Sequence, residues 1–315
     1  MKEVLLLPTF RRNEYLFCAL KRIREQDLRL KIMVFSDRGE DNSELRDIVE
    51  FYNAGLRITP IHNYHGNTFN VMEAYRWAYD CGFELIHMSE DDAMQHADCL
   101  AWHRQMHAEL DFIFCSCGWV FNHHAPITDD IAFAPWFYAP NSCWKREKLA
   151  LIVKHANPIY YNSMVDYVLK NFPDSILHNK GKQLNTAFFE EDALIQFCIM
   201  QDRSQVVWNG IAKIDHVGAQ GYNRKDGPRF MGTLEECVAQ VEELIADPYW
   251  RASVFGRAIV EREIGRELPP RSFKYRVKIP GGWEARFESE LNLKRLPKRI
   301  LSVPVPDSAE IVLDS

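Results

Sequence analysis

Residues 84–92 read ELIHMSEDD, a short apolar run that ends in three adjacent carboxylates. The run from Glu84 to Met88 predicts a buried strand. Glu90, Asp91 and Asp92 repel one another, and a fold keeps such groups together where cations, water or backbone donors offset the repulsion. The end of a buried strand leaves little room for water. The stretch therefore predicts a divalent cation site, and its oxygen ligands suit Mg²⁺ or Mn²⁺.

Strand and helix patterns alternate before this stretch. Periodicity predicts strands at residues 4–7, 31–35 and 56–61, and helices at residues 14–26, 42–51 and 68–81. Gly82 is placed to end the last of these helices. With the strand at 84–88 the order is β-α-β-α-β-α-β, which predicts a parallel sheet with right-handed crossovers. We therefore expect an α/β fold, a Rossmann-like, mostly parallel sheet flanked by helices.

A polar loop follows each of these four strands. In sheets of this kind, ligands bind outside the carboxyl ends of the strands. Four polar loops at one edge predict a nucleotide site. In chain order, the loop residues are Pro8, Thr9, Arg11, Asp37, Gly66, Asn67, Glu90, Asp91 and Asp92.

A second acidic cluster, Glu190 to Asp192, precedes a predicted helix at residues 192–201. Two interpretations are open. Carboxylates are favoured at the positive end of a helix dipole, so the cluster can simply start the helix. A carboxylate held near other acids is also suited to act as a general base.

His216 follows a predicted strand at residues 211–214 and is followed by Val217 and Gly218. A single histidine at a strand end is often structural. In a chain with two acidic clusters it is also a candidate third metal ligand.

The last part of the chain differs in composition. Thr233 and Glu236 have the spacing of a capping box and predict a helix over residues 233–245. Beyond about residue 269, prolines and basic residues increase and extended pieces are expected. Residues 251–300 hold 13 Lys and Arg against 6 Glu, so this segment either meets phosphates or forms a solvated surface with ion pairs.

Composition places the chain among ordinary globular proteins. Its 315 residues are 47% hydrophobic, which is enough for a full core. No apolar run approaches the roughly 20 residues of a membrane span, and the start lacks the features of a signal peptide, so a cytoplasmic location is expected. The eight cysteines include no CxxC pair and are expected to be reduced thiols, several of them buried.

Together, these acidic and histidine elements resemble those of GT-A glycosyltransferases of the family-2 type. Residues 90–92 resemble the DxD motif in the EDD form of N-acetylglucosaminyltransferase I. Glu191 and Asp192 resemble the later xED motif, and His216 resembles the C-terminal histidine. The resemblance spans about residues 3–225. It departs from the family at Glu90, where Asp is frequent, and in the loop after the first strand, where many members have Tyr and Asn-Glu pairs.

The resemblance implies a metal-dependent enzyme that moves a sugar from a nucleotide-sugar, expected to be a UDP-sugar, to an acceptor hydroxyl. Asp92 and His216 would bind Mn²⁺ or Mg²⁺, while Glu90 and Asp91 would contact the ribose or metal-bound water. Asp192 would be the base of an inverting reaction, and Glu191 would hold the acceptor. Residues implied to hold the nucleotide are Pro8, Thr9, Arg11, Asp37, Gly66, Asn67 and Asn70. Residues 1–228 would form the catalytic domain and residues 229–315 a helical and basic extension.

Other function classes remain open to different degrees. A sugar-1-phosphate nucleotidyltransferase needs a glycine-rich loop after the first strand, and residues 8–11 contain no glycine. A non-catalytic nucleotide-sugar-binding module and a metal-dependent nuclease are the remaining alternatives. The acceptor is open between a glycan, a small molecule and a polyanion such as modified DNA, and the sequence gives no oligomeric state.

Overall fold

The structure is a computed structural model. It describes residues 2–64, 67–120, 131–134, 137, 140–163, 166–167, 170, 191–218, 232–279, 283–289, 299–300, 303–304 and 310–313. The chain divides into two units, Met1–Asp215 and His216–Ser315.

The first unit is built on an eight-stranded sheet with the order β3-β2-β1-β4-β8-β6-β9-β7. Its strands are β1 Glu3–Thr9, β2 Ile32–Ser36, β3 Gly55–Ile58, β4 Leu85–Ser89, β6 Ile113–Val120, β7 Ile131–Ala134, β8 Asn141–Lys145 and β9 Gln205–Asn209. Among the described strands, only β8 and β7 run against the other six. The sheet is therefore mixed but mostly parallel, which confirms the predicted fold class.

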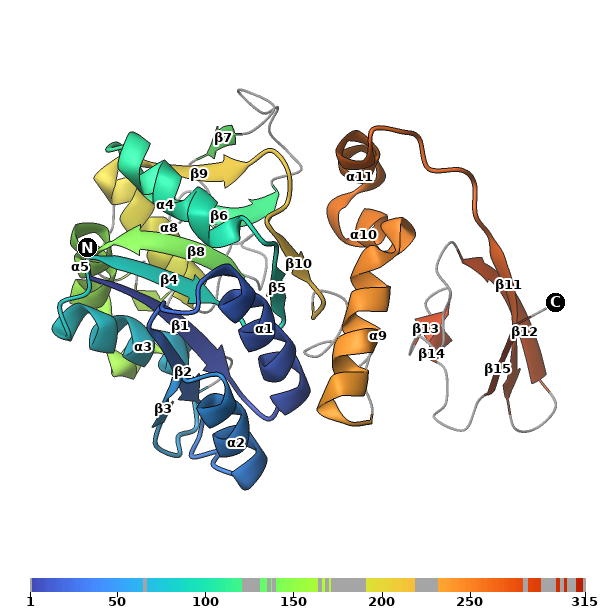
Figure 1. Ribbon diagram of the computed structural model, residues 1–315, viewed down its shortest axis with the longest axis horizontal. Helices are drawn as coiled ribbons and strands as arrows, with labels where there is room; N and C mark the ends of the chain where they lie inside the picture. Colours follow the sequence, from blue (N-terminus) through green and yellow to red (C-terminus); the bar gives the residue numbers. More distant parts are fainter. Residues whose placement is uncertain are drawn as a thin grey trace. The chain divides into compact units, whose positions relative to one another are not determined.

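Helices cover both faces of this sheet (Figure 1). They are α1 Asn13–Gln26, α2 Ser43–Phe51, α3 Thr68–Asp80, α4 Cys99–Glu109, α5 Arg146–His155 and α8 Glu191–Asp202, with a 3-10 turn at Pro158–Tyr160. Val4 and Leu6 of β1 join the core cluster that holds buried residues of α3, α5 and α8. Leu5 and Leu7 are equally buried but lie outside that cluster, as do the buried residues of α1. Alternate residues of β1 thus face two apolar layers, as expected in a sheet buried on both sides.

Local signals mark the start of α2 and the end of α3, and the second of these was predicted. Asn42 caps α2 by accepting a bond from the Leu45 backbone N–H at 2.8 Å. Gly82 follows α3 with a φ of 70°, in the left-handed region that favours glycine. Arg24 of α1 is buried and donates to the backbone oxygens of Leu30 and Tyr52, each at 2.7 Å, so it ties α1 to the end of α2.

One predicted strand is displaced. The strand expected at residues 211–214 forms instead as β10, Ile214–His216, which pairs with β5, Ala93–Gln95. The Ile211 backbone N–H donates to the Asn209 side chain at 2.9 Å, so a turn occupies the first part of the expected strand. The strand β5, directly after the acidic triplet, was not predicted.

The described part of the second unit contains three helices and short antiparallel strands. The elements are α9 Leu234–Ala246, α10 Pro248–Phe255, α11 Arg257–Ile264, β11 Phe273–Ile279, β12 Trp283–Ser289, β13 Arg299–Ile300, β14 Val303–Pro304 and β15 Glu310–Leu313. Thr233 and Glu236 form the predicted capping box of α9. The predicted domain boundary at 228/229 lies outside the described residues.

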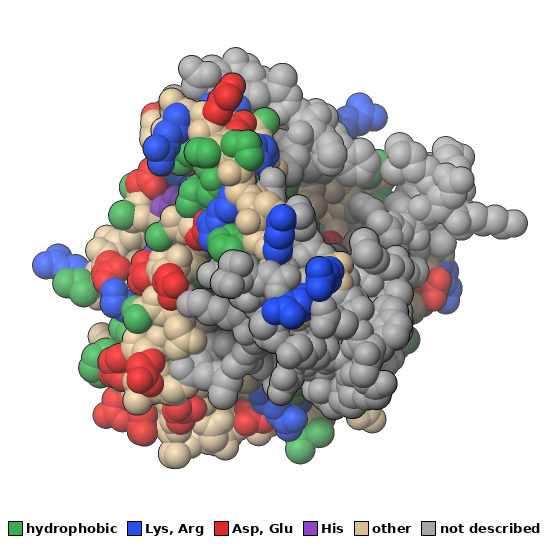
Figure 2. All heavy atoms as spheres, turned by 90° about the vertical axis from the view of Figure 1, so that its right-hand side faces the viewer, with side chains coloured by type: hydrophobic (Ala, Val, Ile, Leu, Met, Phe, Trp, Pro, Cys, Tyr) green, Lys and Arg blue, Asp and Glu red, His purple; other side chains and the backbone are tan. Residues whose placement is uncertain are grey.

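Arginines in the basic segment have acidic partners. Arg251 pairs with Glu263 at 2.8 Å, and Arg257 pairs with Glu261 at 3.0 Å. Figure 2 shows Lys and Arg side chains (blue) together with Asp and Glu side chains (red) among the described residues. The ion-pair interpretation of this segment therefore holds for these arginines.

No helix in the described part of the chain combines the length and the apolar character needed to cross a membrane. All eight cysteines are free, and only Cys81 is exposed. This confirms the expectation that several of the thiols are buried.

Candidate active site

The acidic triplet forms a tight turn at the carboxyl edge of the sheet. The Glu90 backbone N–H donates to the Pro140 carbonyl at 2.9 Å, and the Ala93 N–H returns to the Glu90 carbonyl at 3.1 Å. The turn connects β4 to β5. These bonds fix the backbone from which Glu90, Asp91 and Asp92 project.

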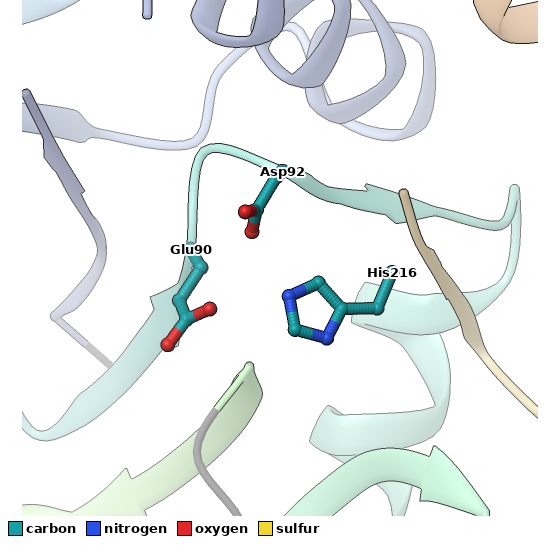
Figure 3. Close-up of side chains that lie close together, drawn as sticks. All are labelled: Glu90, Asp92 and His216. Carbon is teal, nitrogen blue, oxygen red and sulfur yellow. The ribbon is translucent and has the colours of Figure 1, made fainter. Parts of the chain in front are cut away.

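Glu90, Asp92 and His216 point toward one another (Figure 3). One ligand atom from each of these side chains lies within 4.8 Å of the other two. His216 belongs to β10, and the pairing of β10 with β5 brings it to the acids. His96 Nε2 lies 2.7 Å from Asp215 Oδ2 and fastens the two strands beside the site.

This donor set suits a divalent cation. Carboxylate oxygens are the usual ligands of Mg²⁺ and Mn²⁺, and an imidazole nitrogen adds affinity for a transition metal. The cluster contains both residues predicted to bind the metal, Asp92 and His216. It also contains Glu90, for which the resemblance implied a contact to ribose or to metal-bound water.

Asp91 is fully buried and takes part in a different set of contacts. Its Oδ2 accepts a hydrogen bond from Thr9 Oγ1 at 2.6 Å, and its Oδ1 lies 2.5 Å from Arg12 Nη2. Burial raises the pKa of Asp91, and the positive charge of Arg12 opposes that rise. Thr9, predicted to hold the nucleotide, therefore links β1 to the acidic turn.

Arg12 is a site residue that the sequence analysis missed. Its Nη1 lies 2.6 Å from Asp92 Oδ2, so one guanidinium holds Asp91 and Asp92 through separate nitrogens. A signal was present, because Arg12 follows β1 and the acids follow β4, and neighbouring parallel strands end at the same edge of the sheet.

The residues predicted after β1 and β2 have different environments. Pro8 is buried in β1 opposite Phe35 of β2. Asp37 is buried and lies 2.8 Å from His62 Nε2, while its backbone N–H donates to the Thr9 carbonyl at 3.0 Å.

Arg11, in contrast, is exposed and pairs with Glu40 at 2.9 Å. Arg11 and Arg38 have φ values of 54° and 53°, in the left-handed region that non-glycine residues seldom adopt. Such backbone conformations cost on the order of 1–3 kcal/mol each and cluster at functional sites.

Asn67 and Asn70 lie at the start of α3. Asn67 is the residue just before the helix, and its side chain makes no capping bond. Asn70 is fully buried and donates to the Phe35 carbonyl at 2.8 Å, which ties α3 to β2. Gly66 lies outside the described residues.

Glu191 and Asp192 form the first turn of α8. Glu191 is buried and accepts a hydrogen bond from Thr68 Oγ1 of α3 at 2.8 Å. Asp192 is half-buried. Burial raises the pKa of Tyr75 well above its usual value, and the charges of Glu191 and Asp192 add to that rise. The charges of both carboxylates are therefore felt at Tyr75 in α3.

No protein-family model and no curated protein sequence matches the chain. Several solved structures resemble it at low identity. A fragment of TarS from S. aureus, also solved with UDP-GlcNAc, is 13% identical with a TM-score of 0.43, over 68% of this chain and 59% of that one. The mannosyltransferase PcManGT from Pyrobaculum calidifontis, in complex with GDP-Man and Mn²⁺, is 13% identical with a TM-score of 0.38, over 82% and 84%.

A cytidylyltransferase from Leptospira borgpetersenii is 11% identical with a TM-score of 0.38, over 55% of this chain and 73% of that one. The chain thus spans about 59% of the length of the TarS fragment. Similarity at this level assigns no reaction to the chain.

Proposed function

We propose that the protein transfers a sugar from a nucleotide-sugar, by expectation a UDP-sugar, to an acceptor hydroxyl with the help of a divalent cation. The observation that carries this proposal is the convergence of Glu90, Asp92 and His216 at the carboxyl edge of a mostly parallel sheet. Ligands of such sheets bind at this edge. A diphosphate leaving group needs positive charge there.

We assign Glu90, Asp92 and His216 as the cation ligands. The imidazole favours Mn²⁺ over Mg²⁺, because Mg²⁺ prefers oxygen ligands and retains its waters. When bound, the cation would neutralise the charge that develops on the departing diphosphate.

We assign the nucleotide to the edge formed by the ends of β1 and β2. Arg11 is exposed there in an ion pair with Glu40, and its guanidinium would reach a phosphate group of the ligand. Pro8 and Thr9 would lie beneath the nucleotide at the end of β1, and Asp37 and Asn70 hold the edge through their buried hydrogen bonds. Asn67, at the start of α3, is the remaining described residue of the predicted nucleotide set.

We assign Asp192 as the general base. Its carboxylate would take the proton from the acceptor hydroxyl as that oxygen attacks the anomeric carbon, which inverts the configuration. Asp192→Asn should then lower the transfer rate by about 100-fold or more. Asp202→Asn is the matched control, because Asp202 ends the same helix in an ion pair with Lys148. A loss of less than about tenfold in Asp192→Asn would exclude this role.

We propose that the catalytic domain extends past β10, as in the predicted division into residues 1–228 and 229–315. The two units divide between Asp215 and His216, inside this strand. A boundary after β10 keeps His216 in the same domain as the acids that it joins through β5.

The donor class is tested by thermal unfolding with nucleotide diphosphates and sugar nucleotides, each with and without Mn²⁺. A ligand at about 100 times its dissociation constant should stabilise the wild-type protein by roughly 2.7 kcal/mol. Asp92→Asn should lose the Mn²⁺-dependent part of this shift. Asp41→Asn should keep it, because Asp41 pairs with Arg46 on the surface.

A Mn²⁺-dependent shift with sugar nucleotides but no turnover under any acceptor condition would favour a binding module. Mn²⁺-dependent cleavage of nucleic acid, without any shift by sugar nucleotides, would favour a nuclease. No shift with any nucleotide would contradict the proposed function.

A further inference from the structure

Arg12 occupies an unusual position for a residue at the start of a helix. It directly precedes α1, yet its side chain makes no capping bond there. The guanidinium instead contacts Asp91 at 2.5 Å and Asp92 at 2.6 Å, and only 17% of the side chain is exposed. Its stem is therefore held by the protein, and its charged end is directed at the acidic turn.

The two carboxylates held by Arg12 differ in their other contacts. Asp91 is fully buried and also bound to Thr9, so it is fixed within the protein. Asp92 belongs to the cluster with Glu90 and His216 that suits a cation. Because Arg12 contacts each carboxylate through a different nitrogen, the contact to Asp92 can break while the contact to Asp91 persists.

Arg12 also balances charge that the turn cannot balance by itself. Three adjacent carboxylates project from one turn, and their repulsion destabilises the fold until a cation offsets it. A guanidinium supplies that charge without any metal and forms strong, short bonds to carboxylates. Arg12 and a divalent cation would, however, repel each other across the same carboxylate.

We propose that Arg12 is the built-in counter-ion of the acidic turn, and that it releases Asp92 but keeps Asp91 when a divalent cation binds. This inference rests on the cation site of the proposed function. It makes Arg12 a positioning residue, which holds the carboxylates in place before binding and lowers the affinity of the free protein for the cation.

The test is a titration of the free protein with Mn²⁺, without nucleotide, in which the electron paramagnetic resonance signal of unbound Mn²⁺ gives the affinity. Arg12→Gln should bind Mn²⁺ about tenfold more tightly than wild type. A neighbouring positive charge commonly lowers the affinity of a carboxylate for a proton by one to three pKa units, and Arg12 should weaken the binding of another cation to Asp92 in the same way. Arg46→Gln removes the same charge from an exposed pair with Asp41 and should change the affinity by less than about twofold.

A second, more conservative variant keeps the test decisive if Arg12→Gln does not fold. Arg12→Lys keeps the charge, but a single ammonium cannot hold two carboxylates through separate nitrogens, so its Mn²⁺ affinity should fall between those of wild type and Arg12→Gln. The midpoint of thermal unfolding adds an independent readout. In a chelator, Arg12→Gln should unfold at a lower temperature than wild type, and Mn²⁺ should restore more of its stability than it adds to wild type.

The outcomes separate this inference from the proposed function. If wild type binds Mn²⁺ and Asp92→Asn does not, the cation site stands. An Arg12→Gln affinity equal to or weaker than that of wild type would then overturn the counter-ion role alone. If wild type, Arg12→Gln and Asp92→Asn all fail to bind Mn²⁺, the cation site fails, and this inference fails with it.

Discussion

The hydrogen bond from Thr68 to Glu191 predicts a measurable loss of stability on a small substitution. Thr68→Val keeps the shape and volume of the side chain but replaces the hydroxyl that donates to the Glu191 carboxylate at 2.8 Å. Thr68 is fully buried and Glu191 is 6% exposed, so water cannot easily take the place of the hydroxyl. The substitution therefore isolates the loss of one buried, charge-assisted hydrogen bond.

The expected magnitude follows from that geometry. Hydrogen bonds to charged groups contribute about 1.5–3 kcal/mol, so Thr68→Val should lower the free energy of unfolding by roughly 2 kcal/mol. For a unit of this size, that loss corresponds to a decrease of about 4–8 °C in the midpoint of thermal unfolding. The bond joins the starts of α3 and α8, so the first turn of α8, which carries Asp192, should loosen as well.

The assay is thermal and urea unfolding of the metal-free protein, followed by circular dichroism, together with amide exchange in the first turn of α8. Thr68→Ser, which keeps the hydroxyl, is the matched control and should retain most of the stability. Equal stability of Thr68→Val and wild type would refute the reasoning, because it would mean that the hydroxyl and the carboxylate are equally well solvated without each other.

Three further predictions concern other described residues. Burial lowers the pKa of His107 to about 4, below the usual value of 6.5, so the fold favours its neutral form. Above pH 6.5 His107 is neutral in both states, and as the pH falls toward 4 the unfolded state takes up a proton that the folded state excludes, so the free energy of unfolding falls by about 3 kcal/mol in total. Unfolding curves measured across this pH range should show the fall, and His107→Gln should make the free energy of unfolding depend less on pH. Arg24→Met removes donors from several buried backbone oxygens and should lower the free energy of unfolding by about 3 kcal/mol in urea, whereas Arg29→Met, at an exposed position, should change it by less than about 0.5 kcal/mol. A thiol reagent should modify one cysteine of the native protein rapidly, and Cys81→Ser should abolish that fast phase; rapid loss of a second thiol would contradict the burial of the remaining seven.

The first half of the fold could be predicted because its signals are local. Strands and helices of the β-α-β region have distinct apolar periods, and Asn42 and Gly82 mark helix ends by chemistry that acts within a few residues. Thr233 gives the same kind of signal in the second unit.

Strand β8 shows what such signals omit. It lies antiparallel between β4 and β6, and the polar residues Asn141 and Ser142 are buried in it. Asn141 is tolerated because His103 Nε2 lies 2.6 Å from its side-chain oxygen. A polar strand stabilised by a partner from a distant helix carries no apolar pattern, so the sequence does not reveal it.

The candidate site likewise contains residues that the sequence alone reveals and residues that only the fold brings into place. The acidic triplet is contiguous and could be recognised directly from the sequence. Arg12 and His216 reach it only through the sheet, Arg12 because β1 lies beside β4, and His216 because β10 pairs with β5. The strand that pairs with β5 is Ile214–His216 rather than the predicted 211–214, and no local pattern encodes a pairing between segments so far apart.

The pairing of β5 with β10 also sets an order of events during synthesis. His216 leaves the ribosome roughly 120 residues after Asp92, which is about 6–24 s at the usual 5–20 residues per second. Throughout that interval the nascent chain carries both carboxylates of the cluster without their imidazole partner. Arg12 precedes Asp92 by 80 residues and is therefore already available to neutralise the turn. On the proposed assignment of Glu90, Asp92 and His216 as cation ligands, a chain released before His216 would carry the two acids without the imidazole of that site.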